Sequence, residues 1–434
     1  MAEQFDAIII GAGIIGASVG LELARRGWRT LNVDRLPAAG YGSTSASCAI
    51  IRSHYSTLDG TALAFEGYQY WRHWVEHLGV ADERGLARFE EVGCAVMKTL
   101  SNGYLKSICE NLDTLGILWE DWDNETLKKR LPIYDLRCFA PAKLPDDPGF
   151  GEATGLAIAG AAFMPQAGYI SDPQLATHNI QIAAEAAGAR FQFNTDVIKI
   201  HQADGAVRGV ILANGDEIEA PVVVNVGGPH SAKVNEMAGV ADAMKIKTRA
   251  LRQEVVHLPS PDGFDYMTHG PVASDSDIAC YSRPEVGNYI LFGSEDPECD
   301  AREWADPDNY NTEFTAQWQT QALRAGQRVP GLKIPNQAAG VVSLYDVTDD
   351  WIPIYDCSDL PGFYMAIGSS GNQFKNAPVA GAMMAELISR CQDGHDHDAD
   401  PVRFDYLYTK RQANIGFFSR NREINPNSSF TVLG

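Results

Sequence analysis

Residues 6–34 read DAIIIGAGIIGASVGLELARRGWRTLNVD. The apolar run before Gly11 predicts a buried strand, a helix follows the glycines and ends near Gly27, and a second strand ends at Asp34. The G-x-G-x-x-G spacing allows a tight turn, close approach of a diphosphate and close packing of helix on strand. Asp34 is placed to accept hydrogen bonds from a ribose. This order of features predicts a βαβ unit that binds a dinucleotide.

Charge and length limit the classes of partner. The chain has 434 residues, with 35 Lys plus Arg against 56 Asp plus Glu, a formal net charge of −21. Such a field repels nucleic acid and anionic membranes, so we expect neither as a partner. No apolar run is long enough to span a bilayer. An anionic substrate would therefore need a local basic pocket.

Cysteine usage indicates a reducing compartment. The eight cysteines include no C-x-x-C pair, so we expect free thiols rather than disulfides or a zinc site. The His395-Asp396-His397-Asp398 run is better explained as a solvated acidic loop, and we predict no metal. No basic segment precedes the first strand, as a signal peptide would require. The cytoplasm is the expected location.

A loop of small and hydroxyl-bearing residues follows Asp34. It runs from Arg35 to Ser47 and leads into Cys48-Ala49-Ile50-Ile51-Arg52-Ser53-His54-Tyr55. With so little side-chain bulk, it can wrap closely around a cofactor. By composition alone, a flexible connection is an equally good explanation.

The middle of the chain completes a nucleotide-binding domain. Asp172-Pro173 predicts a capped helix that runs to Ala187. A β-meander follows over residues 196–219, with its hairpin turn at Asn214-Gly215. An apolar strand over 222–226 then ends at Gly227-Gly228. Helix, meander and a strand ending in paired glycines are typical of an FAD-binding domain, whereas a plain NAD domain has no such meander.

The remaining segments predict a second, sheet-based layer and a return to the cofactor. Strands are expected near 252–258, 278–283 and 288–293, followed by a helix from about 312 to 326. Residues 362–368 form a buried strand that enters the glycine-rich turn 368–375, and a helix covers 378–390.

Five segments together resemble the D-amino-acid oxidase and sarcosine oxidase superfamily of FAD-dependent enzymes. They are GAGIIG at 11–16, GSTSASCAIIRSHY at 42–55, NVGGPHS at 225–231, YSRPE at 281–285 and GSSGNQFK at 368–375. The resemblance covers nearly the whole chain. It is closer to the sarcosine, dimethylglycine and iminodiacetate oxidases and dehydrogenases than to true D-amino-acid oxidases.

The resemblance implies an α/β fold in which a Rossmann-type FAD-binding domain is interleaved with an α+β, antiparallel-sheet substrate domain. We expect the FAD-binding domain to comprise residues 1–84, 152–240 and 337–395. The substrate domain then comprises 85–151 and 241–336, and 396–434 form a C-terminal tail. The predicted cofactor-binding residues are Gly11, Gly13, Ile14, Ile15, Gly16, Asp34, Arg35, Gly42, Ser43, Thr44, Ser47, Cys48, Val197, Gly227, Gly228, Gly368, Gly371, Asn372, Gln373 and Lys375.

The implied reaction is oxidation of the C–N bond of a small N-substituted amino acid by hydride transfer to flavin, followed by hydrolysis of the imine. Arg52 and Lys375 match the arginine and lysine with which monomeric sarcosine oxidases hold the substrate carboxylate. An arginine grips a carboxylate bidentately, and both cations gain strength where water is excluded. His54, Tyr281 and Arg283 are further predicted catalytic residues. His54 with Tyr55 could equally be a packed pair, and Arg283 could instead pair with Glu285.

Three positions depart from relatives of this kind. The cysteine that links flavin covalently in monomeric sarcosine oxidases aligns with Ser343, and the histidine used by dimethylglycine dehydrogenases aligns with Ser45-Ala46. We therefore expect noncovalent FAD. The lysine that promotes oxygen reactivity aligns with Leu291, which leaves the electron acceptor, O₂ or another, open.

The sequence is also compatible with other functions. A D-amino-acid or proline dehydrogenase would use the same groups, and a substrate with two carboxylates would need a further cation such as Arg283 or Arg252. A flavin-bearing electron-transfer subunit with a protein partner is a different class, although no cysteine cluster for an iron–sulfur centre is present. A noncatalytic nucleotide sensor would bind FAD that no amine reduces.

Overall fold

The predicted βαβ unit lies at the centre of a six-stranded sheet in the computed structural model, which describes residues 4–434. Neighbouring strands run parallel except for the antiparallel edge pair β20–β21. In spatial order the strands are β20 (Ile354–Cys357), β21 (Phe363–Ile367), β13 (Val222–Asn225), β1 (Ala7–Ile10), β2 (Thr30–Val33) and β9 (Arg190–Gln192). Because the carboxyl ends of the parallel strands meet at one edge, loops from distant parts of the chain converge on a single crevice.

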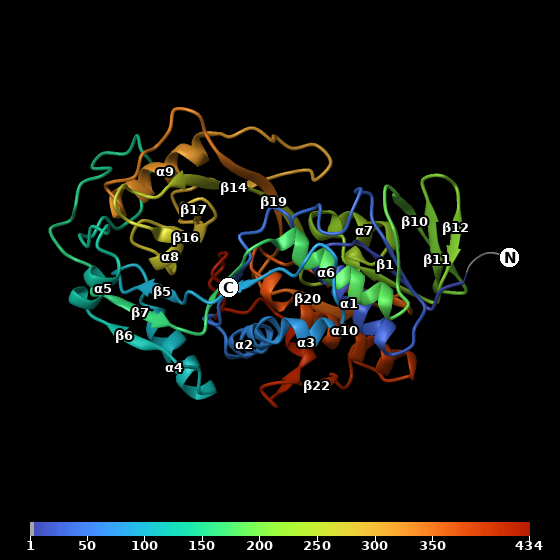
Figure 1. The fold of residues 1–434 in the computed structure, drawn as a ribbon. Helices are drawn as coiled ribbons and strands as arrows, with labels where there is room; N and C mark the ends of the chain where they lie inside the picture. The colour runs from blue at the N-terminus through green and yellow to red at the C-terminus, as the bar shows by residue number, and fades with distance from the viewer. Residues whose placement is uncertain (1–3) are drawn as a thin grey trace.

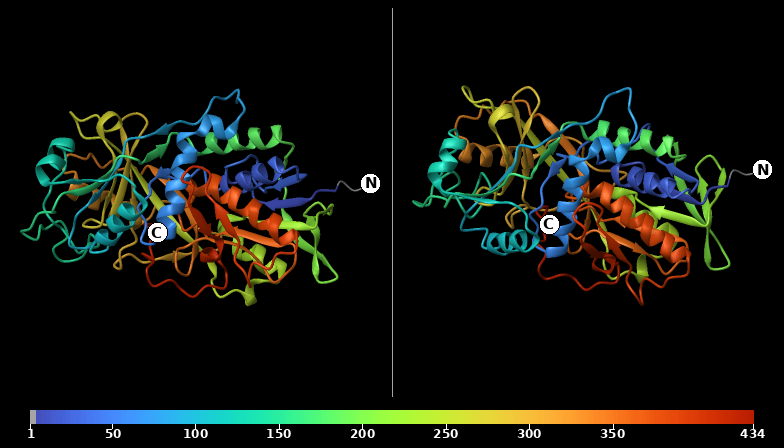
Figure 2. Two further views of the ribbon diagram at one scale, coloured as in Figure 1. Left: turned by 90° about the horizontal axis from the view of Figure 1, so that it is seen from below. Right: turned by 60° about the horizontal axis from the view of Figure 1, so that its bottom comes forward.

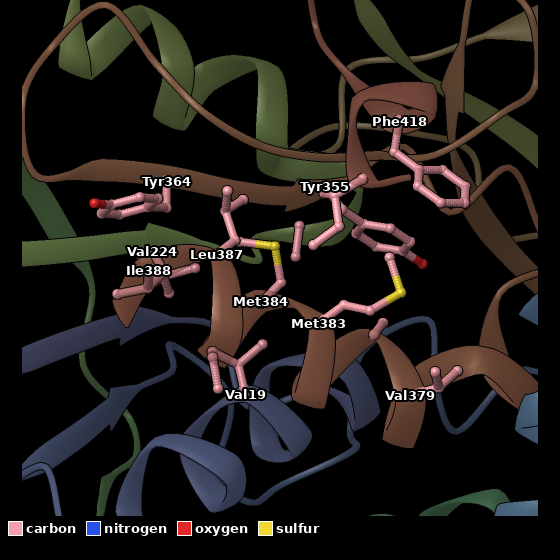
Figure 3. Close-up of a cluster of buried hydrophobic side chains, with 14 of the residues drawn as sticks. Val19, Val224, Tyr355, Tyr364, Val379, Met383, Met384, Leu387, Ile388 and Phe418 are labelled. Carbon is pink, nitrogen blue, oxygen red and sulfur yellow. The ribbon is translucent and has the colours of Figure 1, made fainter. Parts of the chain in front are cut away.

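Both faces of this sheet are buried, which explains its continuous apolar strands. Ala7 and Ile9 of β1 pack in one cluster with helices α1 (Ile14–Arg25) and α10 (Ala377–Gln392). Figure 3 shows this layer, in which Met383, Met384 and Leu387 of α10 lie under the sheet. Ile8 and Ile10 face the opposite side, against the meander and helix α7 (Ser231–Ala238). The meander consists of β10 (Val197–Ala203), β11 (Ala206–Leu212) and β12 (Glu217–Glu219).

Three further helices pack against α1. α6 (Pro173–Ala186) packs beside α1 in a cluster that also includes α2 (Leu58–Arg72) and α3 (Trp74–Leu78). The sequence prediction for α6 is confirmed, since the Asp172 carboxylate accepts the backbone N–H groups of Gln174 and Leu175, each at 2.9 Å. This cap satisfies two of the donors that a helix start leaves free.

A larger sheet forms the second lobe, on the left in Figure 1. Its strands in order are β18 (Glu303–Trp304), β14 (Thr248–Pro259), β17 (Tyr289–Ser294), β16 (Cys280–Glu285), β15 (Val272–Asp275), β5 (Cys94–Met97), β7 (Ala161–Met164) and β6 (Glu120–Trp122), while β19 (Gly340–Thr348) pairs with β14. Helices α4 (Leu105–Leu115), α5 (Asn124–Arg130), α8 (Tyr266–His269) and α9 (Ala316–Arg328) accompany it. A small third sheet consists of β3 (Ile50–Ile51), β8 (Gly168–Ile170) and β4 (Phe89–Glu90), in that spatial order.

Two strands differ from the expected domain boundaries. β7 and β19 fall in segments predicted for the FAD-binding domain, yet β7 pairs with β5 and β6, and β19 pairs with β14 along nine residue pairs, Thr248↔Thr348 to Val256↔Gly340. Both strands belong to the large sheet because their hydrogen-bonding partners lie there. Strand propensity shows that a segment is extended but does not show which sheet it joins.

The tail after Pro401 packs against its own chain. It forms the hairpin β22 (Arg403–Asp405) and β23 (Gln412–Asn414), and its apolar side chains enter the cluster beneath α10. The buried Glu66 of α2 accepts the backbone N–H groups of Tyr408 at 2.8 Å and Thr409 at 2.9 Å. In the views of Figures 1 and 2 the C-terminus lies between the two lobes.

No helix within residues 4–434 combines the length and apolarity that crossing a bilayer would need.

Two glycines provide a matched test of the helix packing. A Cβ on Gly381 of α10 would lie 2.7 Å from the Ser18 backbone of α1, whereas a Cβ on Gly326 of α9 would meet nothing closer than 3.8 Å. Gly381→Ala is therefore expected to lower the free energy of unfolding by about 1–3 kcal/mol through overpacking. Gly326→Ala is expected to raise it by about 0.5–1 kcal/mol, because alanine restricts the unfolded chain. Urea denaturation of both variants measures this, and equal stabilities would contradict the close packing of α1 on α10.

Candidate cofactor and substrate site

A large cavity opens at the carboxyl edge of the six-stranded sheet and extends to the second lobe. Its volume is about 1280 Å³, larger than a small substrate alone requires. Residues of the glycine turn, the 41–50 loop, the meander and the turn after β13 line one part, and residues of β14, β15, β16 and β19 line the other. The cavity is therefore shared between the two lobes.

The glycine turn forms one end of the cavity. Gly11 has a φ of +117°, and a Cβ there would lie 2.3 Å from the Val226 carbonyl oxygen, so only glycine fits. Helix α1 begins directly after Gly13 without a side-chain cap and without an acidic residue in its first turn. The Ile14 N–H is donated to Thr44 Oγ1, but the N–H groups that follow it and the positive dipole end face an anion, and the turn fits the diphosphate of FAD.

Asp34 connects the end of β2 to this turn. Its carboxylate accepts the backbone N–H of Ala12 at 2.7 Å and that of Leu36 at 2.9 Å. Burial raises the pKa of this carboxyl, while the two N–H donors oppose the shift. Asp34 lines the cavity beside the glycine turn, where the ribose of a nucleotide would follow its phosphates.

The 35–47 loop packs against both lobes. Thr44 Oγ1 accepts the Ile14 backbone N–H at 3.2 Å, and Ser43 Oγ donates to the Leu344 carbonyl of β19 at 2.9 Å. These bonds join the start of α1 to the large sheet. The loop is an ordered part of the cavity wall, and this favours the cofactor interpretation over the flexible connection.

The structure brings nearly all the predicted cofactor residues to this one cavity. The predicted residues that line it are Gly11, Gly13, Ile14, Ile15, Gly16, Asp34, Arg35, Gly42, Ser43, Thr44, Ser47, Cys48, Val197, Gly227, Gly228, Gly371, Asn372, Gln373 and Lys375. Gly368 does not line it. Gly368 has a φ of +70° and donates its N–H to the buried Asp346 carboxylate at 2.6 Å, so it shapes the turn behind the cavity.

Two buried cations lie around the Tyr55 ring. The Arg52 guanidinium carbon is 4.6 Å from the ring centroid and the Lys375 Nζ is 4.8 Å from it. Arg52 is 7% exposed and Lys375 is 2% exposed. Burial and the neighbouring Arg52 hold the pKa of Lys375 well below its usual range. Lys375 Nζ donates to the Asn372 carbonyl at 2.6 Å, and no carboxylate pairs with either cation among the described residues.

His54 lies next to these cations and lines the same cavity. It is 2% exposed, and neither ring nitrogen has a hydrogen-bond partner within residues 4–434. Burial, with the charges of Arg52 and Lys375, holds its pKa well below the usual value, so the imidazole is neutral. A neutral imidazole with a free lone pair can accept a hydrogen bond from an amine.

Aromatic side chains from the large sheet face this end of the cavity. The Tyr281 hydroxyl of β16 lies 3.4 Å from the Tyr345 hydroxyl of β19 and 3.6 Å from Cys48 Sγ. A Cβ on Gly293 would lie 2.2 Å from the Tyr281 ring, and one on Gly371 would lie 2.5 Å from the Tyr345 ring. The two glycines therefore provide the space that the two rings occupy.

The other arginines considered from the sequence are paired elsewhere. Arg283 forms an ion pair with Glu285 at 2.8 Å, and its guanidinium lies 4.6 Å from the Tyr169 ring centroid. Arg252 pairs with the buried Glu254 at 2.8 Å and donates to two backbone carbonyls. Neither is among the residues lining the cavity. The structure thus favours the alternative in which Arg283 pairs with Glu285.

Sequence reasoning missed several groups that line the cavity. An ionic cluster at its edge joins the predicted Arg35 to groups that were not predicted: Arg35 and His230 contact Asp308 at 2.6 and 2.9 Å, and Lys233 contacts Asp306 and Asp308 at 2.5 and 2.6 Å. Val432 and Leu433 of the tail also line the cavity. Two of the missed groups had a sequence signal: His230 lies in the NVGGPHS segment, and Tyr345 lies two residues after Ser343.

One group of potential metal ligands has a protein explanation. Asp356, Cys357 and Asp398 converge within the described residues, but the Arg420 guanidinium lies among them. It is 3.0 Å from Asp356 and 2.7 Å from Asp398, so these carboxylates already have a cationic partner.

A buried carboxyl beside the cavity wall predicts a pH-dependent stability. Burial raises the pKa of Glu295 to about 7, although it accepts hydrogen bonds from Ser274 Oγ at 2.6 Å and Ser276 Oγ at 3.0 Å. Because the folded pKa lies above the unfolded one, the native state binds more protons between about pH 4.5 and 7, and this group's stabilising contribution is lost as the pH rises through that range.

Glu295→Gln mimics the protonated form. We expect it to match the parent near pH 4.5 and to exceed it by about 2–3 kcal/mol in free energy of unfolding at pH 8. Denaturant titrations at both pH values measure the difference, with the exposed Glu83→Gln as control. A gap that does not change with pH would contradict the buried, proton-binding Glu295.

With this geometry established, comparison with known proteins defines the class. Residues 6–387 match the family described as "DAO: FAD dependent oxidoreductase", and the chain belongs to this family. It is 23% identical over 404 residues to glycine oxidase of Geobacillus kaustophilus (strain HTA426), covering 91% of this chain and 96% of the relative. It is 24% identical over 412 residues to monomeric sarcosine oxidase of Bacillus sp. (strain B-0618), covering 91% and 95%.

Solved structures share the fold. The crystal structure of glycine oxidase from Geobacillus kaustophilus has a TM-score of 0.74 at 20% identity and covers 97% of this chain and 100% of that one. L-proline dehydrogenase from P. horikoshii has a TM-score of 0.73 at 21% identity, covering 90% and 95%. Iminodiacetate oxidase from Chelativorans sp. BNC1 has a TM-score of 0.66 at 18% identity, covering 88% and 95%. The family and the shared fold together make the protein an FAD-dependent oxidoreductase.

Proposed function

We propose that this enzyme oxidises a small N-substituted glycine with one carboxylate, such as sarcosine or dimethylglycine. The observation that supports this most is the buried pair Arg52 and Lys375 around Tyr55, at the end of the cofactor cavity nearest the large sheet. FAD, when bound, would supply the acceptor for the hydride equivalent that leaves a carbon bonded to the substrate nitrogen.

The residues of the chain bind and orient the substrate. Arg52 and Lys375 hold the carboxylate, which fixes the C–H bonds next to the substrate nitrogen relative to the cofactor. An incoming carboxylate also favours protonated Lys375, so it reverses the effect that burial and Arg52 have on the pKa of this lysine. His54, neutral and without a partner, accepts a hydrogen bond from the substrate amine. Tyr281 and Tyr345 contact the N-substituent.

Pairing of the other arginines favours a monocarboxylate over iminodiacetate. A second carboxylate would need a cation that is free to bind it, but Arg283 and Arg252 already pair with Glu285 and Glu254. Breaking either buried pair would leave an uncompensated charge.

A second candidate is an L-proline dehydrogenase. Proline is also a secondary amine with one carboxylate, and the solved structure of an L-proline dehydrogenase shares the fold over 90% of this chain. The same cations would hold its carboxylate.

Anaerobic reduction of the bound flavin tests these proposals. Sarcosine, dimethylglycine, iminodiacetate, glycine, D-alanine and L-proline are mixed with the FAD-loaded protein, and loss of flavin absorbance is followed. Rapid bleaching by sarcosine or dimethylglycine is expected, and readmission of air then distinguishes oxygen from another electron acceptor. If no amine bleaches a flavin that dithionite reduces, the proposal is wrong, and an electron-transfer subunit with a protein partner becomes the better explanation.

Flavin attachment is tested in the same preparation. Ser343 and the pair Ser45-Ala46 line the cavity, and by resemblance they align with residues that link flavin in related enzymes, yet neither a serine hydroxyl nor a methyl group forms such a bond readily. We propose that FAD is noncovalent, so acid precipitation should release the yellow cofactor into the supernatant.

A further inference from the structure

The last residues of the chain lie inside the site. Residues 428–434, the C-terminal segment, place Val432 and Leu433 on the cavity wall. Val432 is 6% exposed and packs in a cluster with Tyr281, Trp351 and Leu251, and Tyr345 packs against this cluster. Figures 1 and 2 show the C-terminus between the lobes rather than on the outside of either.

This segment binds the arginine that we assign to the substrate carboxylate. Arg52 Nη2 donates to the Val432 carbonyl at 3.0 Å and to the Leu433 carbonyl at 2.7 Å. Arg52 Nη1 donates to the carbonyl of His54. The Gly434 carbonyl accepts the Ser56 backbone N–H at 3.0 Å. The segment therefore binds the Arg52 guanidinium only through uncharged backbone carbonyl oxygens.

The geometry of a guanidinium makes this occupancy incompatible with a bidentate carboxylate. A guanidinium offers two forks to a carboxylate, one from Nη1 and Nη2 and one from Nε and Nη2. Both forks use a hydrogen of Nη2, and Nη2, which carries two hydrogens, already donates to two carbonyls of the C-terminal segment. A carboxylate can enter either fork only if a segment carbonyl leaves.

We propose that the C-terminal segment is a displaceable part of the substrate site, which occupies Arg52 until a monocarboxylate takes its place. The proposal rests on the proposed function in one respect, the assignment of Arg52 to the substrate carboxylate. Charge-assisted hydrogen bonds to a carboxylate are stronger than bonds to neutral carbonyls, so the substrate wins this competition at Arg52.

The outer end of the segment stays attached when its inner end leaves. Ser428 Oγ donates to the Asp350 carbonyl at 2.5 Å, and Arg302 Nη2 donates to the Phe430 carbonyl at 2.7 Å. Neither bond involves a residue that contacts Arg52. Displacement is thus confined to residues 431–434, and the segment returns when the ligand dissociates.

Gly434 provides a point variant that expels the inner end. A Cβ there would lie 2.2 Å from Cε1 of Tyr55, and the φ of Gly434 is +81°. The Tyr55 ring cannot move away easily, since its hydroxyl donates to the Asn372 carbonyl at 2.8 Å. Gly434→Ala should therefore displace the segment. Gly394→Ala is the matched control, because Gly394 has a φ of +90° and nothing lies within 4 Å of its Cβ position.

The test titrates the FAD-loaded full-length protein with acetate, a monocarboxylate without an amine, and follows the flavin absorbance. We expect Gly434→Ala, and a second variant lacking residues 428–434, to bind acetate about tenfold more tightly than the parent and Gly394→Ala, because a site available only part of the time lowers apparent affinity in proportion. Unchanged or weaker acetate binding in both variants would show that the segment is a fixed wall.

Hydrogen exchange of the parent protein gives a readout that needs no variant. Acetate should accelerate amide exchange in residues 431–434 while exchange near Asp350 stays constant. Slower exchange of 431–434 with acetate would contradict displacement. This inference fails separately from the proposed function. If amines bleach the flavin but the variants bind acetate as the parent does, only the inference is wrong. If the variants bind acetate more tightly but no amine is oxidised, only the proposed function is wrong.

Discussion

Arg52→Met should weaken acetate binding by about 10²–10³-fold, the cost of removing charged hydrogen bonds from a buried carboxylate. The size of the effect follows from burial: Arg52 is 7% exposed, so water replaces little of what is lost. Without Arg52 the C-terminal segment loses its hydrogen-bonding partner, and this change alone would make the site easier to enter. Weaker acetate binding by the variant therefore measures the lost contact between Arg52 and the carboxylate. Flavin absorbance titration of the FAD-loaded variant gives the dissociation constant.

Three further variants identify the cause. Lys375→Met should weaken acetate binding in the same direction, and Arg52→Lys should give an intermediate loss because a lysine keeps the charge but not the fork. Arg283→Met removes an arginine that is at least as buried but does not line the cavity, and it should leave acetate affinity unchanged. Equal losses for Arg52→Met and Arg283→Met would point to general damage to the fold instead of a carboxylate site.

Gly13→Val should lower FAD affinity by at least about 10²-fold, since a side chain at this position occupies the space through which the diphosphate reaches the N–H groups of α1. The protein without FAD should tolerate the change. Gly13 has a φ of −66°, which any residue adopts, and a Cβ there would meet only the Thr44 hydroxyl, at 3.2 Å.

The measurement is flavin release followed by fluorescence, alongside the thermal midpoint of the protein without FAD. Gly103→Val serves as control, because nothing lies within 4 Å of a Cβ at Gly103 and this residue does not line the cavity. Tight FAD binding by Gly13→Val would mean that the diphosphate is held elsewhere. A lowered midpoint without FAD would mean that the turn, rather than the cofactor contact, was damaged.

Much of the cofactor half could be predicted from the sequence, because its signals are local. The glycine spacing after β1, the Asp172 cap and the glycine turn after β21 each act within a few residues. The resemblance then linked Arg52 to Lys375 across more than three hundred residues, and the structure places both around Tyr55.

What could not be predicted depends on contacts between distant segments. Tyr281 and Arg283 are two residues apart on β16, and the alternation of side chains along a strand places both on the same face. Yet Arg283 lies two residues further along, beyond the cavity, where Glu285 and Tyr169 meet it. The binding of the C-terminal segment to Arg52 uses backbone carbonyls, which every residue carries and no sequence pattern marks.

The strand order of the six-stranded sheet also determines when the sheet can form during translation. β1 begins at residue 7 and lies between β2 and β13, and β13 pairs in turn with β21, which ends at residue 367. A nascent chain leaving the ribosome therefore carries its most apolar strand for most of translation before the sheet can close. A fragment of residues 1–84, which contains the glycine turn, should neither fold nor retain flavin. Cells that produce this enzyme faster than chaperones can cover β1 should accumulate it in inclusion bodies.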